Sequence, residues 1–218
     1  MEKSKPYVIL SAATSIDGKI ATVTGDSKLS SKLDGIRLHK LRSKVDAILV
    51  GKNTVLLDDP MLTVRHTKGK NPIRIVLDSK GSISKNSKII QTSKKIPTIV
   101  VVSNKITKSN LERLKKFPIE IIIAGKNSID IKLLLKKLSY KKIKSVLVEG
   151  GGTTNWEFIK NGLFDELIIT LSPFLIGGKD AVSLVEGDGF RKITNSPILR
   201  LKSTMRLKNH LVLNYVKV

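Results

Sequence analysis

The clearest structural signal in the sequence is Ser145-Val-Leu-Val-Glu-Gly-Gly-Gly-Thr-Thr-Asn-Trp156. Its apolar β-branched residues predict a strand, its glycines a tight turn, and the following residues the start of a helix. Backbone N–H groups and the positive end of the helix dipole converge at a helix start and attract anions. We therefore predict an anion site at Gly150–Gly152, with Glu149 beside the ligand at the end of its strand. From this stretch alone, a tight turn that binds nothing is the alternative.

Strand-like and helix-like segments alternate along most of the chain. Strands are expected at Tyr7–Ala13, Asp46–Val50, Pro72–Leu77, Thr98–Val102 and Ile119–Ala124. Helices are expected from Ser30 or Ser31 to about Val45, from Ser109 to about Lys116 with Glu112 completing a capping box, and over Asp130–Tyr140. This alternation predicts an α/β fold with a mainly parallel sheet flanked by helices.

The C-terminal part of the sequence has a different pattern. Glu166–Leu171, Leu199–Arg206 and Leu211–Val218 are strand-like without a long helix between them, and Lys208-Asn209 is a plausible hairpin turn. The sheet is therefore expected to be mixed, with antiparallel strands at its C-terminal end. We expect residues 1–218 to form a single domain, and we expect the Lys/Ser/Asn-rich stretch Gly81–Lys95 to be a mobile surface segment.

The charge of the chain is strongly positive. Lys and Arg number 40 against 18 Asp and Glu, which gives a net charge of +22. One interpretation is a nucleic-acid-binding protein. The lysines are scattered through nearly every segment, however, and aromatic residues make up only 4%, so stacking platforms for single strands are scarce. We therefore expect no specific nucleic-acid partner, and favour a field that attracts phosphorylated small molecules.

Other bulk features limit the class of protein. The chain has no cysteine, which excludes disulfides and zinc sites built on thiolates. No apolar run approaches the roughly 20 residues that span a bilayer, and the N-terminus does not resemble a cleavable signal. A cytoplasmic protein without a membrane partner is expected. The histidines His39, His66 and His210 show no metal-ligand spacing, so we expect no metal site.

A second cluster of polar residues follows the strand that ends near Val50. If Thr54–Asp58 forms a helical turn, Thr54 and Asp58 face the same side. An Asp59-Pro60 corner then turns the chain toward Arg65. On its own this pattern is more typical of a structural turn before proline. On the preceding helix, Arg42 has a planar fork suited to phosphate, whereas Arg37 is expected on a solvated face.

Three motifs together resemble one family, the riboflavin-biosynthesis reductases. They are Ser15-Ile-Asp-Gly-Lys19, Thr54-Val-Leu-Leu-Asp-Asp-Pro-Met-Leu-Thr-Val-Arg65 and Glu149-Gly-Gly-Gly152. They occur in the family's order and at its approximate separations, and the stand-alone archaeal form is the most similar. The resemblance implies a dihydrofolate-reductase-like fold and a homodimer. It also implies NADPH-dependent reduction of the ribosylamino group of a phosphorylated pyrimidine, with NADH as the alternative cofactor.

The resemblance also implies roles for individual residues. Asp58 and Glu149 are the expected catalytic residues. The expected cofactor-binding residues are Thr54, Asp58, Ser79, Gly150, Gly151, Gly152 and Thr153. The expected substrate-binding residues are Ser27, Arg42, Leu62, Arg65 and Glu149, with both arginines on the 5′-phosphate.

The sequence departs from the bacterial members of this family at two positions. Ser11 replaces a lysine of the first strand, so a catalytic role for that lysine does not transfer to this chain. Leu29 replaces a tryptophan, which removes ring stacking at that point. Two alternatives stay open from the sequence: a pterin reductase with the same fold, and the basic nucleic-acid-binding protein.

Overall fold

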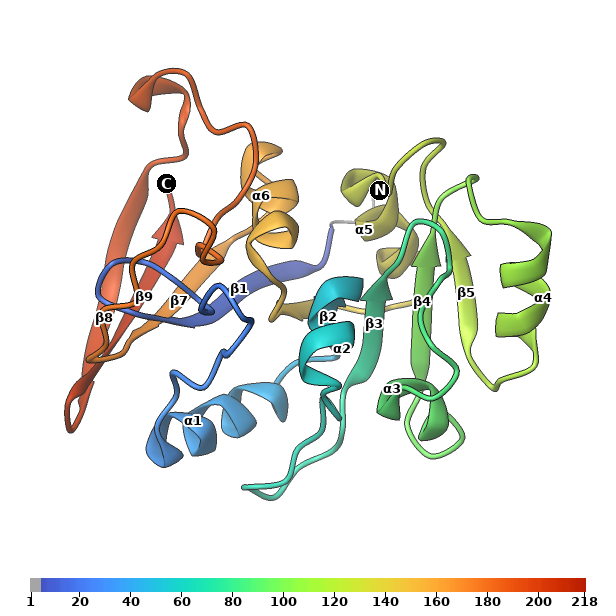
Figure 1. Ribbon diagram of the computed structural model, residues 1–218, viewed down its shortest axis with the longest axis horizontal. Coiled ribbons are helices and arrows are strands. Elements are labelled where there is room, and N and C mark those ends of the chain that lie inside the picture. Colours follow the sequence, from blue (N-terminus) through green and yellow to red (C-terminus); the bar gives the residue numbers. More distant parts are fainter. Residues whose placement is uncertain (1–4) are drawn as a thin grey trace. The chain divides into compact units, whose positions relative to one another are not determined.

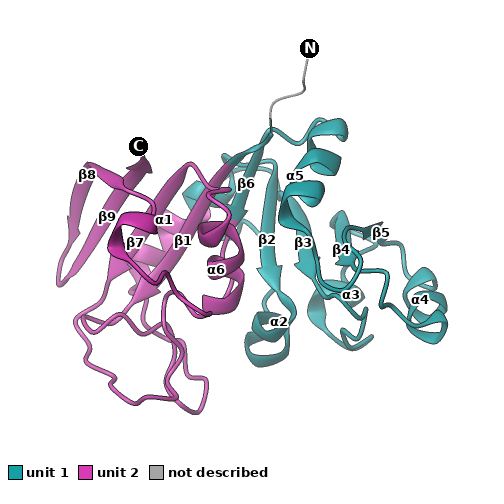
Figure 2. Cartoon of the chain, turned by 90° about the horizontal axis from the view of Figure 1, so that it is seen from above, with its two compact units in different colours: residues 1–7, 40–147 teal, residues 8–39, 148–218 magenta. Residues whose placement is uncertain are grey.

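The computed structural model describes residues 5–218, which divide into two compact units (Figure 2). Unit 1 contains the chain up to Tyr7 and Lys40–Leu147. Unit 2 contains Val8–His39 and Val148–Val218. The strands of residues 5–218 belong to a mixed sheet that is mainly parallel (Figure 1). The prediction of a single domain over residues 1–218 stays a prediction.

Unit 1 is built from alternating strands and helices. Its elements are β2 (Ala47–Gly51), α2 (Lys52–Asp58), β3 (Ile73–Leu77), α3 (Lys88–Gln91), β4 (Thr98–Val102), α4 (Lys108–Lys115), β5 (Glu120–Ile123), α5 (Ile131–Tyr140) and β6 (Ser145–Val148). The strand order is β5-β4-β3-β2-β6, and β2–β3, β3–β4 and β4–β5 pair in parallel. These strands are apolar almost throughout because helices cover a parallel sheet on both faces. The predicted βα alternation is confirmed.

Unit 2 contains the strands of the C-terminal part. Its elements are β1 (Tyr7–Thr14), most of α1 (Lys32–Arg42), α6 (Gly152–Lys160), β7 (Glu166–Leu171), the short 3₁₀ helix η1 (Ile193–Asn195), β8 (Leu199–Leu207) and β9 (His210–Lys217). The order is β1-β7-β9-β8. β1 and β7 are parallel, whereas β7–β9 and β8–β9 are antiparallel. The predicted hairpin is confirmed, with Lys208 at a positive φ of 55° in its two-residue turn.

Two predicted helix boundaries are wrong by a few residues. α4 begins after Thr107, whose hydroxyl accepts a hydrogen bond from Asn110 N at 3.2 Å. Thr107 therefore caps the helix two residues before the predicted Ser109. α1 ends at Arg42 rather than near Val45, and β2 begins at Ala47, so residues 43–46 are needed to turn the chain into the sheet.

The prediction of a mobile surface segment over Gly81–Lys95 is also wrong. Ile83, Ile89 and Ile90 are buried within it, with at most 1% of their surface exposed. The Arg113 guanidinium donates to Gly81 O and Ile83 O at 2.6 and 2.7 Å. The three isoleucines among the lysines and serines were the signal in the sequence that this segment packs against the core.

Candidate functional site

The helix predicted after β2 is present as α2. Thr54 and Asp58 lie one turn apart on it, as the four-residue spacing requires. Asp59 ends the helix in a left-handed conformation with φ 39°, and its N–H donates to Val55 O at 3.1 Å. α2 therefore stops abruptly, and the chain turns into the Asp-Asp-Pro corner that leads to Arg65.

Two predicted phosphate-binding arginines meet at one residue of unit 1, Thr63. Arg42, at the end of α1, is 8% exposed and donates from Nη1 to Thr63 O at 3.1 Å. Arg65 donates from Nη1 to Thr63 Oγ1 at 2.7 Å. Leu62, between the corner and Thr63, is 2% exposed and has a φ of 49°. The 61–65 segment is thus a tightly held turn with two guanidinium groups beside it.

The loops that follow β3, β4 and β5 are tied together at the carboxyl end of these strands. Ser79 O accepts hydrogen bonds from the N–H and hydroxyl of Ser103, both at 3.0 Å. Asn104 N donates to Gly125 O at 3.0 Å. Each loop carries a lysine next to these contacts, namely Lys80, Lys105 and Lys126. The predicted cofactor residue Ser79 therefore lies on a cationic rim.

In unit 2, the glycine turn leads directly into α6. Gly151 is the N-cap residue and makes no side-chain capping bond. A Cβ added to Gly152 would lie 2.4 Å from Ser183 O, and Gly152 O accepts a hydrogen bond from Glu186 N at 3.1 Å. Glycine is therefore required at 152 because the 183–186 loop packs against its backbone. Glu149 is half-buried and Thr153 exposed.

The Ser15–Lys19 motif has a structural role that the sequence alone did not indicate. Asp17 accepts hydrogen bonds from Ile176 N and Gly177 N at 3.0 and 2.7 Å. These N–H donors, with a contribution from Ser15, hold the pKa of Asp17 well below its usual range. Lys19 Nζ donates to Ser183 Oγ at 3.0 Å. The motif therefore fastens the loop that follows β7. The predicted substrate residue Ser27 is exposed.

The expectation that Arg37 lies on a solvated face is wrong. Its Nε donates to Asp34 Oδ1 at 2.7 Å, and the same carboxylate accepts from the hydroxyl of Thr170 on β7 at 2.7 Å. Asp34 is 2% exposed, so this ion pair is largely removed from water. It anchors α1 to β7.

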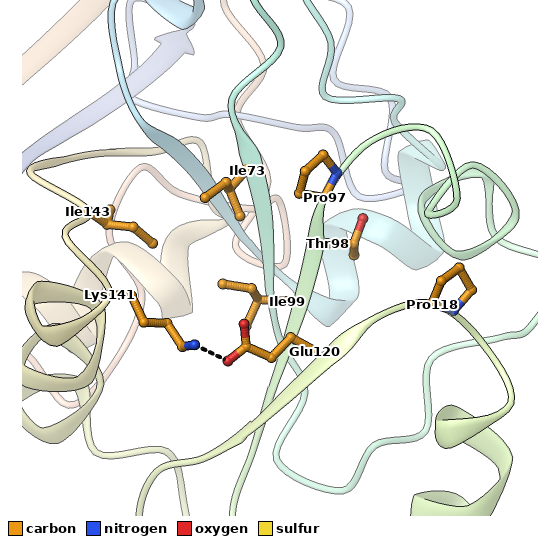
Figure 3. Close-up of a pocket in the computed structure, with 8 residues that line it drawn as sticks. All are labelled: Ile73, Pro97, Thr98, Ile99, Pro118, Glu120, Lys141 and Ile143. Carbon is orange, nitrogen blue, oxygen red and sulfur yellow. Dashed lines mark ion pairs between the residues drawn. The ribbon is translucent and has the colours of Figure 1, made fainter.

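A pocket of ≈ 380 Å³ lies elsewhere in unit 1 (Figure 3). Its lining includes Ile73, Thr98 and Glu120, which are the first residues of β3, β4 and β5, and an ion pair joins Glu120 to Lys141. Apart from Arg42 at the end of α1, the predicted site residues of unit 1 instead follow the carboxyl ends of β2 and β3. This pocket contains none of the predicted site residues.

Two further features bear on the class of the protein. Over residues 5–218, the structure brings no three His, Asp or Glu side chains together in a way that could hold a metal ion. His39 is buried and His210 Nε2 lies 3.2 Å from Leu29 O. Within the same range, no helix has the length and apolar character that crossing a membrane requires.

Residues 6–213 match the family described as the RibD C-terminal domain. The chain belongs to this family. The resemblance carried by the three motifs is thus confirmed, and with it membership of a family that contains reductases. The RibD C-terminal domain assignment covers both units and every predicted site residue.

One relative and two solved structures are similar to this RibD C-terminal domain over nearly its whole length. The 2,5-diamino-6-ribosylamino-4(3H)-pyrimidinone 5′-phosphate reductase of Methanothermobacter thermautotrophicus is 39% identical over 214 residues, covering 97% of this chain and 98% of the relative. A diaminohydroxyphosphoribosylaminopyrimidine deaminase/5-amino-6-(5-phosphoribosylamino)uracil reductase from Thermotoga maritima has a TM-score of 0.81 and 26% identity. This chain spans only 57% of that longer protein, with 98% of its own length covered.

The fold comparison extends to dihydrofolate reductase. The enzyme from Enterococcus faecalis has a TM-score of 0.54 at 13% identity, over 97% of this chain and 96% of the other. At that identity the similarity concerns the fold alone. The predicted dihydrofolate-reductase-like fold is confirmed.

Sequence reasoning did not single out two residues that contact the segments carrying the predicted site residues. Asp59 was interpreted only as part of the Asp59-Pro60 corner, and Arg74 only as one residue of the expected strand Pro72–Leu77. The available signal for Arg74 was a charged residue within the otherwise apolar segment Ile73–Leu77, because buried charges occur in cores only with specific partners.

Proposed function

We propose that this chain reduces the ribosylamino group of 2,5-diamino-6-ribosylamino-4(3H)-pyrimidinone 5′-phosphate to a ribitylamino group in riboflavin biosynthesis, with NADPH as reductant. The observation that carries this proposal is the 39% identity, over nearly the full length of both chains, to a reductase of that substrate. The two arginines that meet at Thr63 support it independently, because they fit a phosphorylated ligand.

For the substrate, the proposal assigns the 5′-phosphate to Arg42 and Arg65. Guanidinium groups bind phosphate through paired, charge-assisted hydrogen bonds. Arg42 is buried and held in place by Thr63 O, so little conformational entropy is lost when it binds. The other proposed substrate contacts are Ser27, Leu62 and Glu149.

For the cofactor, the glycine turn fits a phosphate group. Gly151 leaves the start of α6 without a side-chain cap, and Gly152 has no room for a Cβ. The uncapped N–H groups at this helix start favour an anion, whereas Gly152 gives the 183–186 loop room to pack. The proposed cofactor residues are Thr54, Asp58, Ser79, Gly150, Gly151, Gly152 and Thr153. When bound, NADPH supplies a hydride to the substrate.

The lysine rim supports NADPH over NADH. Lys80, Lys105 and Lys126 follow three neighbouring parallel strands, and two backbone contacts join their loops. Three ammonium groups at one edge favour the additional phosphate that distinguishes NADPH from NADH. Replacing Lys80 and Lys105 by glutamine should therefore reduce the preference for NADPH.

Asp58 and Glu149 are the proposed acid–base residues. A closed ribosylamine offers no electrophilic carbon, so the sugar ring must open to an imine before C1′ can be reduced. A carboxylate can move the proton that ring opening requires, or stabilise the positive charge of a protonated imine. Arg42 and Arg65 would meanwhile hold the phosphate end and so fix the position of the reacting carbon.

A substrate comparison tests the proposal. NADPH oxidation is followed at about 0.2 M salt, which suppresses non-specific charge effects, with the phosphorylated pyrimidine, its dephosphorylated form or dihydrofolate. The proposal expects turnover with the phosphorylated pyrimidine and saturable NADPH binding. Turnover of dihydrofolate alone would identify a pterin reductase. Steeply salt-dependent binding of DNA or RNA without NADPH binding would identify a nucleic-acid-binding protein.

The proposal includes a homodimer and a cytoplasmic location. The family resemblance implies the dimer. The location follows from the proposed substrates, which are phosphorylated metabolites held inside the cell. Analytical ultracentrifugation measures the mass in solution, and cell fractionation tests the location.

A further inference from the structure

Arg74, the second residue of β3, is a buried cation that the proposed chemistry does not use. None of its surface is exposed. Its guanidinium donates to neutral acceptors, namely Met61 O at 3.3 Å, Ile89 O at 2.9 Å, Ile96 O at 3.3 Å, Thr92 Oγ1 at 2.8 Å and Thr98 Oγ1 at 2.7 Å. No carboxylate in this set offsets the cost of removing the charge from water. Burial lowers the pKa of Arg74 to about 10, which leaves it charged at neutral pH.

One of these acceptors, Met61 O, belongs to the turn between α2 and β3. Two residues of this turn have left-handed backbone, Asp59 with φ 39° and Leu62 with φ 49°. Asp tolerates this conformation at a helix end, whereas a bulky residue such as Leu62 adopts it only where the surrounding contacts fix it. Arg74 fixes the carbonyl immediately before Leu62, at the point where the backbone is strained.

The other end of the same turn is fixed on α3. Asp59 Oδ1 accepts a hydrogen bond from Lys88 N, the first residue of α3, at 2.8 Å. Asp59 Oδ2 lies 3.7 Å from Lys88 Nζ. Arg74 reaches α3 through Ile89 O and the C-cap residue Thr92. Asp59 therefore contacts this short helix directly, and Arg74 links Met61 to it from β3.

We infer that Arg74 and Asp59 are positioning residues: they dock the Asp59–Leu62 turn on α3 and so hold Thr63 where Arg42 and Arg65 meet. This inference rests on the proposed function, because it takes the phosphate of the substrate as the ligand of the two arginines. A turn released from α3 relaxes away from the strained conformation. Apparent substrate affinity is then reduced in proportion to the fraction of molecules that still keep the turn in place.

Steady-state kinetics of Arg74→Lys and Asp59→Asn test the inference. Lysine keeps the charge but cannot serve five acceptors from one rigid fork. If the docked turn falls to roughly a tenth of the population, the substrate KM rises about 10-fold, while kcat and the NADPH KM stay within about twofold of the original. The double variant is expected to raise KM less than the product of the single effects, because both residues hold the same turn.

Leu138→Ala is the matched control. Leu138 is fully buried in α5 of the same unit, so its truncation lowers stability without touching the turn. The control is expected to lower the thermal midpoint and leave the substrate KM unchanged. A lowered midpoint with an unchanged KM in Arg74→Lys would show a purely structural role and overturn the inference. Where Arg74→Lys does not fold, an unchanged KM in Asp59→Asn overturns it equally.

Hydrogen exchange separates this inference from the proposed function. The Val64 amide, two residues after the turn, donates to Asn71 Oδ1 at 2.8 Å, so its exchange reports on the segment that leads from the turn to Arg65. Faster exchange of this amide in Arg74→Lys than in Leu138→Ala is expected whatever the enzyme reduces. If the unaltered chain reduces no pyrimidine phosphate, the proposed function fails while the docking result stands. Unchanged exchange at Val64 overturns the docking itself.

Discussion

Removing Arg65 or Arg42 should affect substrate binding similarly but stability very differently. Arg65 is exposed and donates to the Thr63 hydroxyl, whereas Arg42 is 8% exposed and donates to the Thr63 carbonyl. Each proposed contact with the phosphate is a charge-assisted hydrogen bond worth about 1.5–3 kcal/mol. Its loss in Arg65→Ala or Arg42→Ala should raise the substrate KM roughly 10- to 100-fold.

The stability effects follow from burial. Arg42→Ala leaves a buried carbonyl without its donor, at a cost of about 1–3 kcal/mol. For a chain of this size each kcal/mol lowers the thermal midpoint by about 2–4 °C, so Arg42→Ala should melt about 2–12 °C lower. Arg65→Ala should stay within about 0.5 kcal/mol, as is usual for exposed positions.

The assay compares the phosphorylated and dephosphorylated substrates with each variant. Initial rates of NADPH oxidation give both KM values, and differential scanning fluorimetry gives the midpoints. The ratio of the KM for the dephosphorylated substrate to the KM for the phosphorylated one should fall toward one in Arg42→Ala and Arg65→Ala. Arg65→Lys should restore part of this difference between the substrates. An unaltered chain that binds the dephosphorylated substrate as well as the phosphorylated one would refute the assignment of the arginines.

Three further predictions follow from the site. Asp58→Asn and Glu149→Gln should each lower kcat more than NADPH affinity, because the proposal gives them proton movement; full activity in both, measured by single-turnover kinetics, would contradict this. Gly152→Ala should weaken NADPH binding in a fluorescence titration, because a Cβ would lie 2.4 Å from Ser183 O. Asp17→Asn should lower the thermal midpoint above about pH 4. The folded pKa of Asp17 is below its ordinary 3.8, so its stabilising effect is present above that value and is lost as pH falls. A midpoint difference that does not shrink in acid would exclude this role.

Much of the fold could be predicted from local patterns. The strand Thr98–Val102 is apolar at nearly every position and matches β4 without error, because a strand covered on both faces has no polar side. The β8–β9 hairpin followed from two strand-like segments separated by two residues. The boundaries of α1 and α4 were less predictable because helix ends depend on which hydroxyl captures the first free N–H. Thr107 does so rather than Ser109.

Site residues could be proposed from the sequence only where they repeat a family motif. Arg42, Arg65 and the glycine turn were proposed in this way, and their roles stay predictions. The lysine rim was not, because Lys80, Lys105 and Lys126 lie far apart in the sequence and come together through strand pairing. Scattered lysines on a chain with a net charge of +22 carry no positional information until the sheet order is known.

Arg74 shows why the remaining part of the site was missed. Local rules make a central strand apolar, and they place charged residues on the surface. Arg74 breaks both rules, and its acceptors come from four separate places: the 59–65 turn, α3, the loop before β4, and β4 itself. Positions at which local preference and observed structure disagree tend to be those where function has imposed a cost. The left-handed Leu62 is a second such position, three residues before Arg65. A buried cation and a strained backbone thus meet at Met61–Leu62, where the proposed positioning role of Arg74 predicts that the turn is held for a ligand as well as for the stability of unit 1.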